Sequence, residues 1–241
     1  MSEGFRNAGH LPKQAGRNQA DPDELPRQRR GTTPQMHGRY PDFDVLSFSD
    51  HWDEQTRTLI VKRVASPPPL RFFDAVETET LSAFCDTVMH QTREPRIPVL
   101  AFIDEKLYTG RLDGFRYADM PNDPDTWRLL ARALDEEAQT RGGDAFGRIS
   151  EELRLEIVGA LAEGELEGAA WTAIPRAYEV AMRSILAGFY SHPWAWNEIG
   201  FPGPAYPRGY MRLGIDQREP WMPEEAFVVD PVADVKERGL E

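Results

Sequence analysis

The chain has 241 residues, of which 40% are hydrophobic and 28% are charged, and its formal net charge at pH 7 is −12. This composition allows one domain of roughly 200 residues with a sizeable core, plus a tail. We expect no direct membrane span, because no run of about 20 apolar residues occurs. The acidic balance also excludes nucleic acid as an expected partner, because the phosphate backbone carries charge of the same sign.

Cysteine content and short motifs indicate no cofactor or metal site in this chain. Cys85 is the only cysteine, so an internal disulfide is excluded and a zinc or iron–sulfur framework is not expected. We find no glycine-rich dinucleotide fingerprint, no phosphate-binding P-loop, no Cys-x-x-Cys-His haem motif and no Gly-x-Ser-x-Gly nucleophile elbow. We therefore expect no catalytic, cofactor-binding or metal-ligating residues here.

The N-terminal residues differ in composition from the rest of the chain. Residues 1–36 are rich in Gln, Asn, Arg, Gly and Pro and poor in aliphatic residues, which is typical of a disordered tail. Arg29 and Arg30 resemble the start of a twin-arginine export signal, but the apolar core that must follow is missing, so no signal peptide is expected. The predicted domain then covers residues 37–225, and a C-terminal tail covers residues 226–241.

Helical periodicity dominates the predicted domain. A short helix is expected before a rigid proline run at 67–69, with candidate caps at residues 49–52. Its common face comprises Thr56, Leu59, Ile60 and Val64. A longer helix is predicted over residues 74–91, because Asp74 and Glu77 have the spacing of a capping box. Its apolar stripe comprises Leu81, Phe84, Cys85, Val88 and Met89.

Four further helices are expected from the same signals. They cover residues 97–109, run from an N-cap at Asp123 to Gly142, follow a cap at Ser150, and begin near Ile174. The stripe of the first of these comprises Val99, Phe102, Ile103 and Leu107. Because alternating strand patterns are rare, the sequence predicts an all-α fold, an irregular bundle of about five to six helices with short connections.

The stretch after the last expected helix is the most distinctive part of the sequence. Eight of the chain's 25 aromatic residues lie between Phe189 and Trp221, among glycines and prolines that prevent a long helix. We expect a rigid, aromatic, Pro/Gly-rich loop region. It wraps back over its own helices and closes their core, or it binds a partner through anchors of the usual Trp, Tyr and Arg types, and both can hold for different side chains. The candidate partner-binding residues are Tyr190, His192, Trp194, Trp196, Asn197, Tyr206, Arg208 and Tyr210.

Histidine and carboxylate side chains leave an alternative function open. His51 lies close to Asp50 and Asp53 in the sequence, and His192 lies among aromatic residues. A stand-alone enzyme would use His51, Asp53 and His192 around a metal ion or as acid and base. A metal site needs three or four converging ligands, so capping or local hydrogen bonding by these residues is the favoured interpretation.

Two parts of the sequence carry a family resemblance. The later part contains Tyr190-Ser191-His192-Pro193, Ile199-Gly200-Phe201-Pro202-Gly203 and Gly209-Tyr210. This motif resembles the end of the gluconate 2-dehydrogenase subunit 3 family, and the run from Leu81 to Phe102-Ile103-Asp104 is similar to that family's opening helices. The resemblance covers roughly residues 72–213.

The resemblance implies a small, non-catalytic accessory subunit of a membrane-associated dehydrogenase that oxidises sugars or sugar acids. In that family the large subunit holds FAD, a multihaem cytochrome c takes the electrons, and the small subunit assists maturation, stability or export of the large one. Many members begin with a twin-arginine signal. Without one, the expected location is the cytoplasm, or the periplasm and cell envelope after co-export with a signal-bearing partner. An orphan structural or binding domain without a dehydrogenase partner is the remaining alternative.

Overall fold

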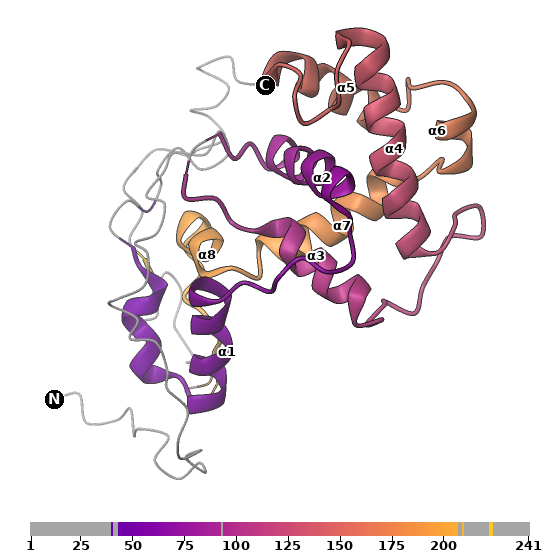
Figure 1. Ribbon diagram of the computed structural model, residues 1–241. Coiled ribbons are helices and arrows are strands. Elements are labelled where there is room, and N and C mark those ends of the chain that lie inside the picture. The colour runs from indigo at the N-terminus through magenta and orange to yellow at the C-terminus, as the bar shows by residue number, and fades with distance from the viewer. Residues whose placement is uncertain (1–39, 41–42, 93, 207–208, 210–221, 224–241) are drawn as a thin grey trace, which may run out of the picture. The chain divides into compact units, whose positions relative to one another are not determined.

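The computed structural model describes residues 40, 43–92, 94–206, 209 and 222–223. Every regular element within these residues is a helix, which confirms the predicted all-α class (Figure 1). The elements are the 3-10 helix η2 (Val45–His51) and the α-helices α1 (Glu54–Ala65), α2 (Ala75–Val88), α3 (Val99–Tyr108), α4 (Asp123–Gly142), α5 (Glu151–Glu163), α6 (Ala169–Ala173), α7 (Ala177–Phe189) and α8 (Pro193–Ile199). They outnumber the five or six helices expected, because the short elements η2, α6 and α8 lack a full amphipathic repeat.

The chain forms two compact units. The first combines Met1–Ser66 with Ser191–Glu241, and the second is Pro67–Tyr190. The tail boundaries predicted at residues 36 and 225, and both tails themselves, lie outside the described residues.

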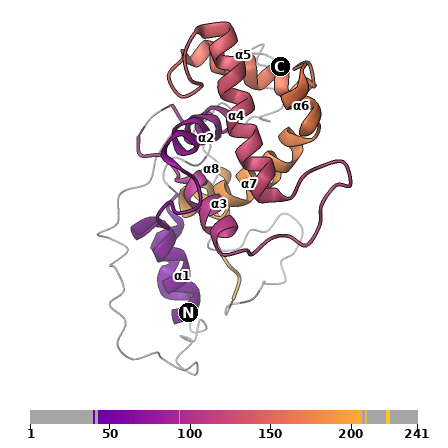
Figure 2. The ribbon, with the colours of Figure 1, turned by 45° about the vertical axis from the view of Figure 1, so that its right-hand side comes forward.

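The second unit is a helical bundle built around α2. This helix packs against α3, α4 and α5, and α7 packs against α3 and α4 (Figures 1 and 2). The predicted capping box is confirmed: the Glu77 backbone N–H donates to the Asp74 carboxylate at 2.9 Å, and the Asp74 N–H donates to the Glu77 carboxylate at 3.2 Å. Beyond the box, Leu81 and Phe84 are fully buried, and the Phe84 ring meets the edge of the Phe146 ring. A capped start and a buried stripe thus hold α2 in the centre of this unit.

The caps of α4 and α1 differ by one or more residues from those expected, and α7 begins at Ala177, three residues after the expected Ile174. The N-cap of α4 is Asn122 rather than Asp123, because the Asn122 side chain accepts the Asp125 N–H at 2.9 Å. The N-cap of α1 is Asp53, which lies just beyond the residues expected to cap it. Leu59 is 56% exposed and does not share the buried face of Ile60 and Val64. In α4 and α1 the residue whose oxygen reaches the first-turn N–H groups decides the start.

The first unit contains η2, α1 and α8. The last of these packs against the other two, and its seven residues are a correction to the expected loop: residues 193–199 are helical. Val45 of η2, Ile60 of α1 and Ala195 of α8 are each at most 1% exposed and contribute to the core of this unit. In the described ranges, no helix has both the length and the apolar character that a bilayer crossing requires.

Candidate partner-binding site

Helix α8 is short because its ends are fixed by residues that also interrupt longer helices. His192 is the N-cap, and its Nδ1 accepts the Trp194 N–H at 3.2 Å. Pro193 occupies the first helical position, where a missing N–H costs nothing. Gly200 ends the helix with φ +68°, a left-handed conformation that favours glycine. Proline and glycine, interpreted above as breakers, are here the start and stop of one helix.

His192 is 1% exposed. The pKa of its imidazole is lowered from 6.5 to about 4: burial is the main cause, a hydrogen bond with the Arg63 backbone opposes it, and the nearby Arg63 charge adds to it. Desolvation dominates because a buried imidazolium has lost its water. The imidazole is therefore neutral near pH 7, which leaves Nδ1 able to accept the Trp194 N–H.

Asn197 links α8 to η2. Its Oδ1 accepts the Val45 backbone N–H at 2.7 Å, and the residue is 3% exposed. The Asn197 Nδ2 atom and the indole nitrogens of Trp52 and Trp194 are buried without a hydrogen-bond partner in the described structure. Each such donor reduces the stability gained from burial, because its hydration has been lost without replacement.

Both predicted tryptophan anchors lie inside the first unit. Trp194 and Trp196 are each 6% exposed, and the Trp196 ring meets the Phe201 ring edge-on at 5.3 Å between centroids. Together with His192 and Asn197 they fit the interpretation in which the aromatic segment closes its own core. Partner binding by these four residues stays a prediction. Because they are buried in this chain, such binding would require the first unit to open locally.

Exposed side chains of the same segment remain accessible to a partner. Tyr190, the C-cap of α7 in the second unit, is 43% exposed. In the first unit, Tyr206 is 57% exposed, and Ile199 and Phe201 are 37% and 39% exposed. The last two were not among the predicted site residues, although both belong to the motif that carries the resemblance. Arg208 and Tyr210, which were predicted, lie outside the described residues.

The residues of the alternative enzyme hypothesis have local structural partners. The Asp53 carboxylate accepts the Gln55 N–H at 2.9 Å and the Thr56 hydroxyl at 2.6 Å as the cap of α1. Burial raises its pKa, but these hydrogen bonds outweigh burial and lower the pKa below its ordinary value. His51 ends η2 and contacts the Phe48 ring. Among the residues that the structure describes, no group of three or more His, Cys, Asp or Glu side chains is placed to hold a metal ion.

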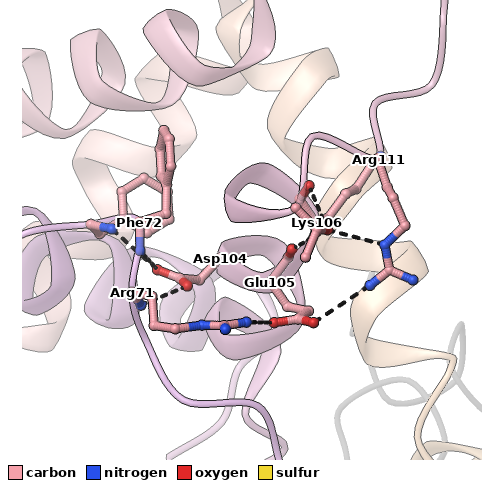
Figure 3. Close-up of polar contacts among 8 residues, drawn as sticks. Arg71, Phe72, Asp104, Glu105, Lys106 and Arg111 are labelled. Atoms are coloured by element: carbon pink, nitrogen blue, oxygen red, sulfur yellow. Dashed lines mark hydrogen bonds and ion pairs between the residues drawn. The ribbon is translucent and has the colours of Figure 1, made fainter.

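A buried carboxylate that the sequence analysis missed fixes the segment before α2. Asp104 on α3 is fully buried, and its two oxygens accept the backbone N–H groups of Arg71 at 2.8 Å, Phe72 at 2.9 Å and Phe73 at 3.1 Å (Figure 3). Three backbone donors to one carboxylate compensate for its lost hydration. Asp104 thus ties the strap of residues 67–73 to α3.

Asp104 did leave a signal in the sequence. It occupies the apolar stripe of α3 together with Leu100, Ile103 and Leu107, at the i, i+3, i+4, i+7 positions that face a core. Phe102, which was expected on that stripe, is only half-buried. An acidic residue on a buried face needs strong hydrogen bonds, but its partners lie more than 30 positions away in the chain, and periodicity does not identify them.

A comparison with protein families matches residues 75–203 to the family described as gluconate 2-dehydrogenase subunit 3. The matched range begins with α2 and ends at Gly203, four residues after α8. Searches of curated proteins and of solved structures return no match.

Proposed function

The chain belongs to the gluconate 2-dehydrogenase subunit 3 family, and from this membership we propose that it is a non-catalytic accessory subunit. Its proposed task is to bind and stabilise, or help to mature, the FAD-dependent large subunit of a sugar or sugar-acid dehydrogenase. The observation that carries this proposal is the family match over residues 75–203, which includes every helix from α2 to α8.

The proposed mechanism is binding alone. A protein that binds the folded state of a partner and not its unfolded state stabilises that partner by mass action. Exposed aromatic and aliphatic side chains supply the contact area for this binding. In the first unit these are Phe201 and Tyr206, with Ile199 beside them in the sequence, and in the second unit Tyr190. The buried Trp196 supports Phe201 through their ring contact.

The redox groups of the complex are proposed to lie in the partners. FAD belongs to the large subunit in this proposal, and a multihaem cytochrome c accepts the electrons. The accessory chain follows its partner, either in the cytoplasm or through co-export with a signal-bearing large subunit.

Deletion and restoration in the native host test the proposal. The chain is deleted, restored on a plasmid, and in each strain the soluble large subunit, its FAD content and its dehydrogenase activity are measured. We expect a several-fold loss of soluble, FAD-loaded large subunit on deletion, because losing about 1–2 kcal/mol of stabilisation changes protein abundance several-fold. Equal amounts of active flavoprotein with and without the chain would overturn the proposal and favour an orphan binding domain.

A matched pair of variants separates binding from mere presence of the chain. Tyr206→Ser removes an exposed aromatic side chain from the first unit, and Val76→Ser removes an exposed aliphatic one, 62% exposed, from α2. Only the first change is expected to reduce the amount of large subunit that co-purifies. Equal co-purification would contradict the role proposed for Tyr206 and leave the accessory function in place.

A further inference from the structure

The C-terminal end of α3 and the loop that follows it, residues 108–120, present apolar side chains to solvent. Tyr108 is 53% exposed, Leu112 is 42% exposed and Phe115 is 56% exposed. Phe115 also meets the Tyr117 ring edge-on at 5.3 Å between centroids. Single exposed apolar residues are ordinary, but several on one short segment mark an interaction site.

Arginine side chains from other parts of the second unit stack on these rings. The guanidinium carbon lies 4.1 Å from the Tyr108 ring centroid for Arg71 and 4.9 Å from the Tyr117 centroid for Arg176. Arg183 of α7 lies 6.0 Å from the Phe115 centroid. Stacking restricts each guanidinium in advance, so less rotamer freedom is lost when its N–H groups bind a carboxylate. We call residues 108–120 with these three arginines the arginine–aromatic surface.

Carboxylates on this surface are shared between cations. Figure 3 shows Glu105 between Arg71 and Arg111, with Arg111 Nη2 3.6 Å from the Glu105 carboxylate. Asp113 is shared in the same way, 2.6 Å from Lys106 Nζ and 3.5 Å from Arg183 Nε. Among the described residues, each of these ion-pair groups joins two cations to one carboxylate side chain.

The arginine–aromatic surface is therefore basic on an acidic chain. Arg176 is balanced by Asp119, 2.9 Å from its Nε, and Glu179 also acts on it electrostatically. Arg116 adds one more exposed cation. With Asp104, which accepts the Arg71 N–H, six cations and five carboxylates of the described residues give a local formal charge of +1, whereas the chain as a whole carries −12. This surface therefore offers cations to an acidic partner although the chain as a whole is acidic.

We propose that the arginine–aromatic surface binds an acidic, partly apolar patch on the dehydrogenase large subunit. For the identity of the partner this inference rests on the proposed function. Carboxylates of the partner complete the two groups that join two cations to one carboxylate, and Leu112 and Phe115 supply the apolar centre of the contact. A second copy of this chain is the weaker occupant, because two molecules of charge −12 repel each other.

Two matched pairs of substitutions test the surface in the full-length chain. The surface pair is Leu112→Ser with Arg116→Glu. The control pair is Leu155→Ser with Arg132→Glu, which alters a leucine on α5 of similar exposure, 44%, and an exposed arginine on α4. Affinity for the purified FAD-bearing large subunit is measured by titration calorimetry at low and high ionic strength, after thermal melts show that both variants fold.

We expect the surface pair to weaken binding at least about tenfold and to reduce its dependence on salt, because an interfacial charge pair has become a repulsion. The control pair should change the affinity less than about twofold, as peripheral residues do. Equal affinity of both pairs overturns the inference while the accessory function stands. If the wild-type chain does not bind the large subunit, both fail. If the surface pair abolishes only self-association of the chain, seen by sedimentation, the occupant is a second copy and the inference is wrong.

Discussion

At the scale of single residues, His192 makes the stability of the first unit depend on pH. Its pKa is lowered from 6.5 to about 4 by burial in the folded chain. Between these values the unfolded chain binds more protons than the folded chain, so the free energy of unfolding falls as the pH falls from about 6.5 to about 4. The loss is on the order of 3 kcal/mol at the acidic end and absent near neutral pH. Protonation also removes the acceptor of the Trp194 N–H.

The variant His192→Asn isolates this effect. Asparagine is a good N-cap and does not titrate, so its free energy of unfolding should fall less steeply with acid than that of the wild type. Urea denaturation at several pH values gives the free energy of unfolding of both proteins. In the difference between the two, the contribution of carboxylates that titrate in the same range cancels. Parallel pH profiles for the two proteins would show that His192 does not carry the dependence.

Gly203 combines a left-handed backbone with a close contact. Its φ is +79°, and a Cβ added there would lie 2.8 Å from Trp52 Cζ2 and 3.2 Å from Val45 Cγ2. Gly209 has a similar φ of +73°, but no atom of the described residues lies within 4 Å of a Cβ added there. Alanine at either position costs about 1–2 kcal/mol for the left-handed backbone, and at Gly203 overpacking adds about 1–3 kcal/mol.

Chemical denaturation of Gly203→Ala and Gly209→Ala measures that difference directly. Both glycines belong to the first unit, so the comparison does not depend on how the two units unfold. Equal losses would mean that the Trp52 ring moves aside without cost and that Gly203 is needed for its φ alone.

At the scale of elements, the hydrogen bonds to Asp104 decide whether the strap of residues 67–73 stays on α3. Asp104→Asn keeps the size of the side chain but replaces one acceptor oxygen with an N–H donor, which then faces a backbone donor. We expect the free energy of unfolding to fall by about 2–4 kcal/mol, because a buried donor loses its partner. The backbone amides of Arg71, Phe72 and Phe73 should also exchange with solvent faster.

Hydrogen exchange followed by NMR tests the local part of this prediction. Asp113→Asn is the matched control, since the Asp113 side chain is 38% exposed and exposed ion pairs contribute at most about 1 kcal/mol. Unchanged exchange of the three strap amides in Asp104→Asn would show that the strap is held by its other contacts, such as the packing of Phe73 against Trp127.

The sequence predicted those elements whose stabilising interactions join residues close together in the chain. The capping box of Asp74 and Glu77 acts over three residues, and α2 was predicted with the buried part of its stripe, Leu81, Phe84 and Cys85, although Val88 and Met89 are only half-buried. The signals that mark both ends of α8 were also present: proline at its first position and Gly200 after its last. They were interpreted as a loop because seven residues show no periodicity. The contacts of Asp104 with the strap and of Asn197 with Val45 join residues 31–33 and 152 positions apart, and only the fold brings those together.

At the scale of the whole molecule, net charge and exposed apolar area decide how the chain associates with other proteins. Composition alone indicated this only in part. A formal charge of −12 opposes self-association of the chain. The aromatic segment near the C-terminus was expected to provide the contact area for a partner. The structure buries Trp194 and Trp196 of this segment in the first unit and leaves Phe201 and Tyr206 exposed. In the second unit, residues 108–120 add exposed apolar and arginine side chains that periodicity did not predict.

If the chain acts by binding alone, the thermal stability of the large subunit must depend on the concentration of the chain. Above the dissociation constant, each tenfold increase in free chain should stabilise the folded large subunit by about 1.4 kcal/mol. The melting temperature of the purified large subunit, measured by the fluorescence of FAD released on unfolding, should therefore rise with the logarithm of the concentration of added chain. The Leu112→Ser, Arg116→Glu pair should need higher concentrations for the same rise, because only its affinity is reduced. A melting temperature that does not change at any concentration of added chain would contradict stabilisation by binding. A catalytic or purely maturational role would then have to explain any loss of active large subunit on deletion.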